Sequence, residues 1–302
     1  MHDTSTVEVI PKGRGTPPPL VQEQVPTILV PLDGSVQALA ALPVARSLAE
    51  LVHAPLHLVH IAEPSIHPKE LLHKLGLSED DVRGTVIEQA SGDAAASIVR
   101  LTRELACAFV VMCPHTGQEE PMGDLGGVAR DVLRWSTCPV VLVRPAWNRQ
   151  QPWGLRHVLV PYDGKPTTAA AFGPALDLAG RADAALVVLH VTVAGTAPPS
   201  EPGSITAPLY VDQAHHEWWA WAQEFLQRAC CVIPLERMPP LRLALAVGEP
   251  GAEIVRSALA HQADLIVLGW HGHLEGEHPC VARAVIREAP CPILMLRASG
   301  AG

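Results

Sequence analysis

The sequence contains the same ordered set of motifs twice, and this repeat restricts the fold more than any other feature. Five segments of the first half recur in the second half in the same order. The matched pairs are 30–34 (VPLDG) with 160–164 (VPYDG), 58–61 (LVHI) with 188–191 (VLHV), 90–93 (ASGD) with 246–249 (AVGE), 109–112 (FVVM) with 265–268 (LIVL), and 137–144 (TCPVVLVR) with 290–297 (PCPILMLR). Such self-similarity indicates a duplicated domain, and a chain of 302 residues has room for two.

Each copy predicts an alternation of strands and helices. Short apolar runs rich in β-forming residues predict strands over residues 27–31, 56–61, 85–89, 109–112 and 140–143. Helical spacing of apolar residues predicts helices over 38–52, over 93–105 and around Val128, Val132 and Leu133. Ser35 and Asp93 are the expected N-caps, and Pro43 is expected to kink the first helix. The same order over 157–296 predicts a parallel sheet with right-handed crossovers in each copy.

Composition restricts the partners and the compartment. With 48% hydrophobic but only 4% aromatic residues, the cores must consist mainly of Ala, Val, Leu and Ile, which suits parallel strands covered on both faces. The formal net charge of −9 disfavours nucleic acid, whose phosphates it repels. An odd number of cysteines and a polar, Pro-rich start favour a cytoplasmic protein. No stretch approaches about 18 apolar residues, so no membrane span is expected.

The second copy departs from the first between residues 194 and 214. This stretch is rich in Pro, Gly and Ser, which predicts a long surface loop or a cover over a site. The helix expected after it carries Trp218, Trp219 and Trp221. Some of these rings are expected to pack under the loop or against a neighbour. The sequence leaves the role of this loop and helix open.

A candidate site follows from the parallel sheet. Open parallel sheets bind ligands outside the carboxyl ends of the strands, where the strand order reverses. Asp33 and Asp163 follow such strand ends, and their carboxylates could accept hydrogen bonds from a ribose or an adenine amine, or bond their own turn amides. Gly126 and Gly127 precede a helix, where backbone amides can approach phosphate oxygens. The alternative is that these glycines only shape a turn.

These features together resemble the universal stress protein family. The likeness lies in a strand-ending Asp, a Gly-x-x-Gly segment, a nine-residue spacing to Gly-Ser or Gly-Thr, and a last strand of Cys-Pro-Val type, here TCPVVLV and PCPILML. It covers residues 27–297, once in each half. The resemblance implies two tandem α/β domains of the adenine nucleotide alpha hydrolase-like fold, each with a five-stranded parallel sheet.

The resemblance also implies a domain organisation. We expect a flexible N-terminal segment at 1–26, domains over 27–147 and 157–298, and a linker at 148–156. Members of the family form dimers through their last strands. In this chain the two halves could therefore pair with each other through residues 140–143 and 293–296. Whether the chain stays monomeric or forms a further homodimer is left open.

Family members that bind ATP use the glycine motif, the first-strand Asp and a residue after the second strand. Carried over by position, the candidates in the first half are Asp33, Ile61, Thr116, Gly126, Gly127 and Val128. Those in the second half are Asp163, Val191, Gly269, Gly272 and Val281. The implied ligand is ATP or AMP, with no metal beyond the Mg²⁺ that accompanies a nucleotide.

The first half departs from the family motif at its start. Cys113 and Thr116 replace the two leading glycines, although the nine-residue spacing to Gly126 remains. Carboxylates concentrated over residues 119–124 would repel a triphosphate.

The second half departs from the motif at its end. Gly269 and Gly272 match the opening, but Pro279 and Cys280 stand where Gly-Ser is expected, and the loop is three residues short. Pro279 also removes one amide donor. Neither half is therefore a complete ATP site.

Other chemistry has less support. A metal could be bound in the second half by His271, His273, His278 and Cys280, but solvated loop histidines are favoured because a structural zinc site needs four defined ligands. A Cys113 nucleophile beside His115 lacks an electropositive setting. No nucleophile elbow, Walker loop or zinc-protease motif occurs. We therefore expect no enzyme activity beyond slow ATP hydrolysis.

Two hypotheses for function follow. The first is a non-enzymatic stress-response sensor or regulator that binds ATP or another adenine nucleotide in at least one domain. The second is a nucleotide-independent protein-interaction module with degenerate nucleotide sites. The identity of the stress and of the protein partner is open under both.

Overall fold

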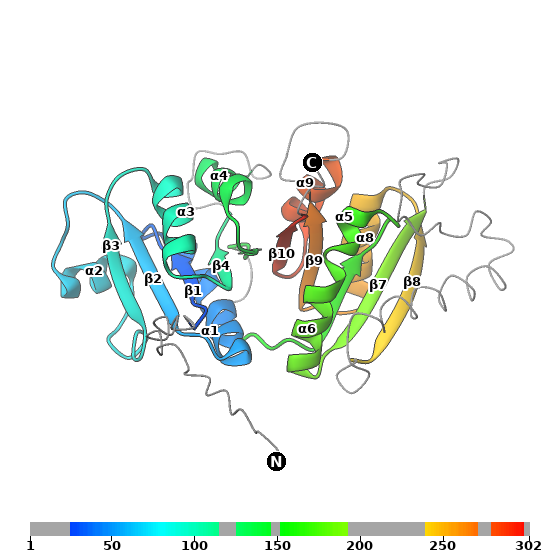
Figure 1. Ribbon diagram of the computed structural model, residues 1–302, viewed down its shortest axis with the longest axis horizontal. Helices are drawn as coiled ribbons and strands as arrows, with labels where there is room; N and C mark the ends of the chain where they lie inside the picture. The colour runs from blue at the N-terminus through cyan, green and yellow to red at the C-terminus, as the bar shows by residue number, and fades with distance from the viewer. Residues whose placement is uncertain (1–24, 115–124, 146–151, 193–238, 271–278, 299–302) are drawn as a thin grey trace, which may run out of the picture.

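A single ten-stranded sheet forms the centre of the molecule (Figure 1). The computed structural model describes residues 25–114, 125–145, 152–192, 239–270 and 279–298. The strand order is β3-β2-β1-β4-β5-β10-β9-β6-β7-β8, with five strands from each half. Neighbouring strands within each half are parallel, whereas β5 and β10 are antiparallel. This confirms two copies of a five-stranded parallel α/β unit.

The first half follows the predicted order of elements. Its bounds are β1 Ile28–Pro31, a 3₁₀ turn Ala38–Ala40, α1 Ala41–Val52, β2 Leu56–Ile61, α2 Pro68–Leu75, β3 Val86–Ala90, α3 Ala94–Glu104, β4 Phe109–Met112, α4 Gly127–Trp135 and β5 Val140–Leu142. Ser35 Oγ accepts a hydrogen bond from the Ala38 amide at 3.1 Å, and Asp93 caps α3 through the Ala96 amide at 2.8 Å. Pro43 lies in the first turn of α1, where proline is tolerated, so the expected kink is not needed.

The second half repeats this order. Its bounds are β6 His157–Pro161, α5 Pro166–Ala169, α6 Phe172–Ala182, β7 Ala185–Thr192, β8 Leu241–Val247, α8 Pro250–Ala260, β9 Leu265–Trp270, α9 Pro279–Glu288 and β10 Ile293–Arg297. The loop predicted over 194–214, the Trp-rich helix after it and nearly all of the predicted N-terminal segment lie outside the described residues. Within the described ranges no helix is both long and apolar enough to cross a membrane.

Helix α2 was missed by the sequence analysis, although its ends carry recognisable signals. His67 accepts a bond from the Lys69 amide as N-cap, and Pro68 occupies the first helical position. Gly76 ends the helix in the left-handed conformation, with φ of +67°. Proline at the start and glycine just past the end are the expected pair of helix boundaries, so this helix was predictable.

The halves join through β5 and β10, as the resemblance implied. Leu294 pairs with Val141 at the centre of the register, with one further residue pair on each side. Two arginines reinforce the joint in a reciprocal way. Arg144 donates to the Ala289 carbonyl just after α9 at 3.0 Å, and Arg297 donates to the Arg134 carbonyl in the last turn of α4 at 2.9 Å. A guanidinium at a helix C-terminus also complements the negative end of the helix dipole.

Each face of the sheet carries a core that continues through both halves. On one face, buried residues of α1, including Val44 and Leu48, belong to the same cluster as Ala175 and Leu176 of α6. The two helices are adjacent near the centre of the molecule (Figure 1). On the other face, residues of α3 and α4 share a cluster with residues of α8 and α9. The halves therefore share their hydrophobic cores.

The chain that connects the halves is packed into this shared core. Trp153 is 5% exposed and belongs to the α1–α6 cluster. Its indole N–H donates to the Asp264 carbonyl at 3.1 Å, and its own carbonyl accepts from Ser47 Oγ of α1 at 2.6 Å. The Asp264 carboxylate accepts from the amides of Arg156 and His157, each at 2.9 Å. The end of the predicted linker is thus fixed to both halves.

We predict that Trp153→Ala lowers the free energy of unfolding by about 3–5 kcal/mol, because it removes a buried indole between the halves and leaves a cavity. Urea denaturation monitored by circular dichroism measures the change. Leu259→Ala, at a side chain that is 61% exposed, is the control and should change stability by no more than about 0.5 kcal/mol. An equally small effect of Trp153→Ala would show that the connection does not contribute to the shared core.

Candidate functional site

The strand order creates one crevice in each half. β1 pairs with β2 on one side and β4 on the other, and β6 pairs with β7 and β9 in the same way. The chain therefore leaves β1 and β4, or β6 and β9, toward opposite sides, and a crevice opens at their carboxyl ends. Asp33 lies just after β1, Ile61 ends β2, and Cys113 directly follows β4, as the order of the elements predicts. Gly126 lies further along the chain, as the N-cap of α4.

Asp33 lies on an exposed turn after β1. One carboxylate oxygen accepts the Ser35 amide at 2.8 Å, which is the bond of an Asx turn. Gly34, with φ of +90°, adopts the left-handed conformation that this turn requires. The α2 helix lies against the turn, since a Cβ on Gly34 would be 3.5 Å from the Lys74 carbonyl oxygen. Asp33 therefore bonds an amide of its own turn, which is one of the two roles expected for it. The same bond also holds its carboxylate in a fixed position at the crevice.

Asp163 occupies the equivalent turn after β6. Its Oδ1 accepts the Lys165 amide at 3.0 Å and the Thr168 hydroxyl. The Thr168 hydroxyl has no counterpart in the first half, where Ala38 stands at the matching position. The second carboxylate is therefore held by an additional side chain from α5.

The start of α4 lies near the end of β4. Gly126 is the N-cap residue, but its own amide donates to the Pro114 carbonyl at 3.0 Å and closes the loop between them. Gly127 and Val128 are exposed, and within the described part of the chain their amides have no hydrogen-bond acceptor. Among the described residues, only Arg130 Nη2 comes within 4 Å of a Cβ placed on Gly127, at 3.9 Å. Two helix-terminal amides thus remain near the end of β4 without an acceptor in the described part of the chain.

Gly269 in β9 has a packing role. A Cβ at this position would clash with the Thr167 carbonyl oxygen of α5, so only glycine allows this close approach. In the first half the matching residue is Cys113, which is buried. Of the other candidates in the second half, Val191 and Val281 are half-buried and pack against the core of the α8–α9 face. Thr116 and Gly272 lie outside the described residues.

Two buried histidines fix the Asp turns from β2 and β7. His60 Nδ1 lies 2.7 Å from the Leu32 carbonyl oxygen, and His190 Nδ1 lies 2.8 Å from the Tyr162 carbonyl oxygen. Because a carbonyl only accepts, each Nδ1 carries the proton. Leu32 and Tyr162 directly precede Asp33 and Asp163, so each histidine ties a strand end to its turn. In the sequence, these histidines stand out only as members of the repeated segments 58–61 and 188–191.

Two of the described cysteines are buried thiols. Burial raises the pKa of Cys107 and of Cys291 to about 12, so both stay protonated thiols at neutral pH. Cys113 is also buried, and its proposed partner His115 lies outside the described residues. The described ranges contain no cluster of His, Cys, Asp or Glu suited to a metal. His271, His273 and His278 lie outside these ranges.

We predict that Gly269→Ala lowers the free energy of unfolding by about 1–3 kcal/mol, because the new methyl group displaces the Thr167 backbone. Denaturant unfolding measures the loss. Gly127→Ala is the matched control. The new Cβ has space in a helix, so the free energy of unfolding of this variant should be unchanged or slightly raised. A Gly269→Ala chain as stable as the wild type would mean that α5 can move away from β9 at little cost.

We also predict that His190 contributes to the loss of stability in acid. Burial lowers its pKa, against smaller opposing effects of the bond to the Tyr162 carbonyl and of Asp163. The unfolded chain therefore binds this proton more readily, and stability is lost as the pH falls below about 6.5, the ordinary pKa of histidine. The change in unfolding free energy between neutral and mildly acidic buffer should be smaller in His190→Asn than in the wild type. His53→Asn, at an exposed position, controls for the loss of one histidine; an unaltered acid loss in His190→Asn would contradict this account.

Known proteins share this sequence pattern. The universal stress protein family matches residues 67–144 and 154–297. A universal stress protein of Mycolicibacterium smegmatis is 26% identical in a match that covers 89% of this chain and 96% of that protein. One from Mycobacterium tuberculosis is 30% identical over 54% of this chain, and the match spans 62% of that relative's length.

Known structures share the fold. A universal stress protein from Archaeoglobus fulgidus, 16% identical, covers 91% of this chain and 99% of its own with a TM-score of 0.61. A Pseudomonas aeruginosa protein of unknown function, 19% identical, covers 90% and 92% with a TM-score of 0.64. A universal stress protein solved in complex with cAMP, 20% identical, covers 48% of this chain and 98% of its own with a TM-score of 0.34. Because the family matches more than half of the chain, in both halves, this protein belongs to the universal stress protein family.

Proposed function

We propose that this protein is a non-enzymatic, cytoplasmic stress-response sensor that binds ATP or another adenine nucleotide at the carboxyl ends of β1 and β4. The observation that carries the proposal is the start of α4. Gly127 and Val128 offer two helix-terminal amides without an acceptor among the described residues, and no described backbone atom of another element lies within 4 Å of a Cβ placed on Gly127. Such amides, with the positive end of the helix dipole, favour a phosphate group.

The turn that holds Asp33 supports the same site. It lies across the crevice from α4, because β1 and β4 are neighbours in the sheet. Its carboxylate is oriented by the Ser35 amide, and the preceding carbonyl is held by His60. A carboxylate that is fixed before the ligand arrives loses little conformational entropy when a ribose hydroxyl or adenine amine binds to it.

The second half has less to offer a phosphate. Gly269 is in close contact with Thr167, and α9 begins at Pro279, which has no amide proton. We therefore propose that nucleotide binds in the first half and that the crevice beside β9 has a mainly structural role. The alternative function is an interaction module without nucleotide. It is favoured by the Gly126 amide, which is already bonded to Pro114 and cannot serve a ligand in this conformation.

We predict that Gly126→Asp weakens nucleotide binding by about tenfold or more without unfolding the chain. Gly126 has an ordinary φ of −57° and is the N-cap of α4, a position that Asp favours, so the helix should keep its stability. The added carboxylate would repel the phosphates at the same place. Titration calorimetry with ATP and with AMP measures the affinity, and mass spectrometry of small molecules released on denaturation shows any nucleotide that copurifies.

The variant Asp33→Asn distinguishes the role of Asp33 in the turn from a role in binding the nucleotide. The Asn side-chain oxygen can still accept the Ser35 amide, so the turn is kept while the charge is lost. A weaker affinity in Asp33→Asn supports contact between the carboxylate and the nucleotide, and an unchanged affinity assigns Asp33 to the turn alone. Asp163→Asn is the matched control in the second half. If the wild-type chain neither copurifies with an adenine nucleotide nor binds one in the titration, the sensor proposal fails and the interaction module is favoured.

A further inference from the structure

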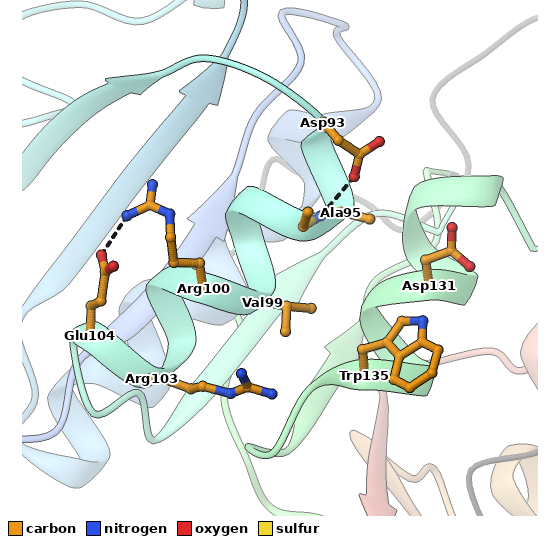
Figure 2. Close-up of a pocket in the computed structure, with 9 residues that line it drawn as sticks. Asp93, Ala95, Val99, Arg100, Arg103, Glu104, Asp131 and Trp135 are labelled. Carbon is orange, nitrogen blue, oxygen red and sulfur yellow. Dashed lines mark hydrogen bonds and ion pairs between the residues drawn. The ribbon is translucent and has the colours of Figure 1, made fainter.

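Helices α3 and α4 enclose a surface cleft in the first half (Figure 2). The cleft has a volume of about 620 Å³, and the buried residues Ala95 and Val99 of α3 form its apolar floor, with the exposed Ala96 beside them. Trp135, in the last turn of α4, lies along one side and is 56% exposed. An exposed indole next to an apolar floor is typical of a docking surface.

The matching helices of the second half pack differently. In the repeat, Gly251 of α8 matches Ala95, and Ala284 of α9 matches Asp131. A Cβ on Gly251 would lie 2.7 Å from the Ala284 Cβ, so α8 and α9 are in close contact at the point where α3 and α4 border the cleft. In the first half the larger Ala95 and Asp131 stand at these positions, and both line the cleft. The two helix pairs therefore differ in their residues at the place where the cleft lies.

Two opposite charges in the cleft have no partner within the described part of the chain. Arg103 of α3 and Asp131 of α4 are exposed and make no ion pair or hydrogen bond with another described residue through their side chains. By contrast, Arg100 is paired with Glu104 at 2.6 Å, and Asp93 caps α3. In Figure 2, Arg103 and Asp131 lie on opposite sides of Val99. The cleft thus presents an unpaired cation and an unpaired anion across an apolar centre.

We propose that this cleft binds a second copy of the same chain, cleft to cleft, about a twofold axis that passes over Val99. Such an axis places Arg103 of each copy opposite Asp131 of the other, so both charges are satisfied by one symmetric contact. The same contact covers Trp135 and the apolar floor. Charge pairs of this kind fix the register of an interface more than its total affinity. At the matching positions, the second half has Leu259, Ala284 and Glu288 and cannot form this pairing.

The inference does not depend on nucleotide binding, and a charge swap in the full-length chain tests it. Sedimentation velocity over a range of concentrations measures the dimer dissociation constant. We predict that Arg103→Glu and Asp131→Arg each weaken the dimer by about tenfold or more. The double variant Arg103→Glu/Asp131→Arg should restore it, because the swapped charges again face each other. Leu259→Glu, which places the same residue at the matching position of the second half, should leave the dimer unchanged.

Three results would overturn the proposal. The first is a wild-type chain that is monomeric at all concentrations; the cleft would then not bind a second copy, and a different protein would be the remaining partner. The second is a dimer that is indifferent to Arg103→Glu, and the third is a double variant as weak as the single ones. Far-ultraviolet circular dichroism checks folding; both positions are exposed, so each variant should fold. Trp135→Ala provides an independent measurement, since it should weaken the dimer while Glu288→Ala does not.

Discussion

The antiparallel pairing of β5 with β10 is the contact on which the rest of the structure depends. Alone, each half would end in an exposed strand edge with unpaired backbone groups, which is a template for uncontrolled association. Pairing the two edges within one chain satisfies these groups and makes one ten-stranded sheet. The helices on each face then share a continuous core, and Arg144 and Arg297 can each reach across to the C-terminal end of a helix in the other half. The two crevices consequently open in a fixed geometry set by the approximate twofold symmetry of the joint.

Within this symmetric frame, the contacts that build the fold are repeated, and the contacts that border the candidate sites have diverged. His60 and His190 make the same bond to the carbonyl before each Asp turn, with lengths of 2.7 and 2.8 Å. Around the crevices, however, Gly269 touches the Thr167 carbonyl, whereas its counterpart Cys113 is a buried side chain. A site can tolerate such divergence because the sheet and its two cores already fix the positions of the strands. Duplication thus allows the two crevices to differ while the halves share one frame.

The repeat made most of the fold predictable, because each half of the sequence independently predicts the same order of strands and helices. All five predicted strands of the first half begin and end within one residue of the observed bounds. Helix α2 was not predicted because it contains few apolar residues. Pro68 and Gly76 mark its two ends, but no matching segment was identified in the other half to support them. The candidate site was less predictable. Spacing identified Gly126 and Gly269, but it could not show that the Gly126 amide is bonded to Pro114 or that a Cβ on Gly269 would meet a backbone oxygen. Both facts depend on contacts between segments far apart in the sequence.

This distinction decides how the glycines should be interpreted. A glycine is required either because a ligand approaches its backbone or because another part of the chain does, and the sequence looks the same in both cases. Gly269 matched the motif well, yet its surroundings already account for it, since Thr167 occupies the space that a Cβ would need. Gly127 belongs to the half in which Cys113 and Thr116 replace the leading glycines of the motif. Even so, no described backbone atom of another element approaches it, and its amide at the start of α4 has no described acceptor. A glycine that the protein itself does not require is the stronger candidate for contact with a ligand. The first half, despite its weaker motif, is therefore the better place to look for a bound nucleotide.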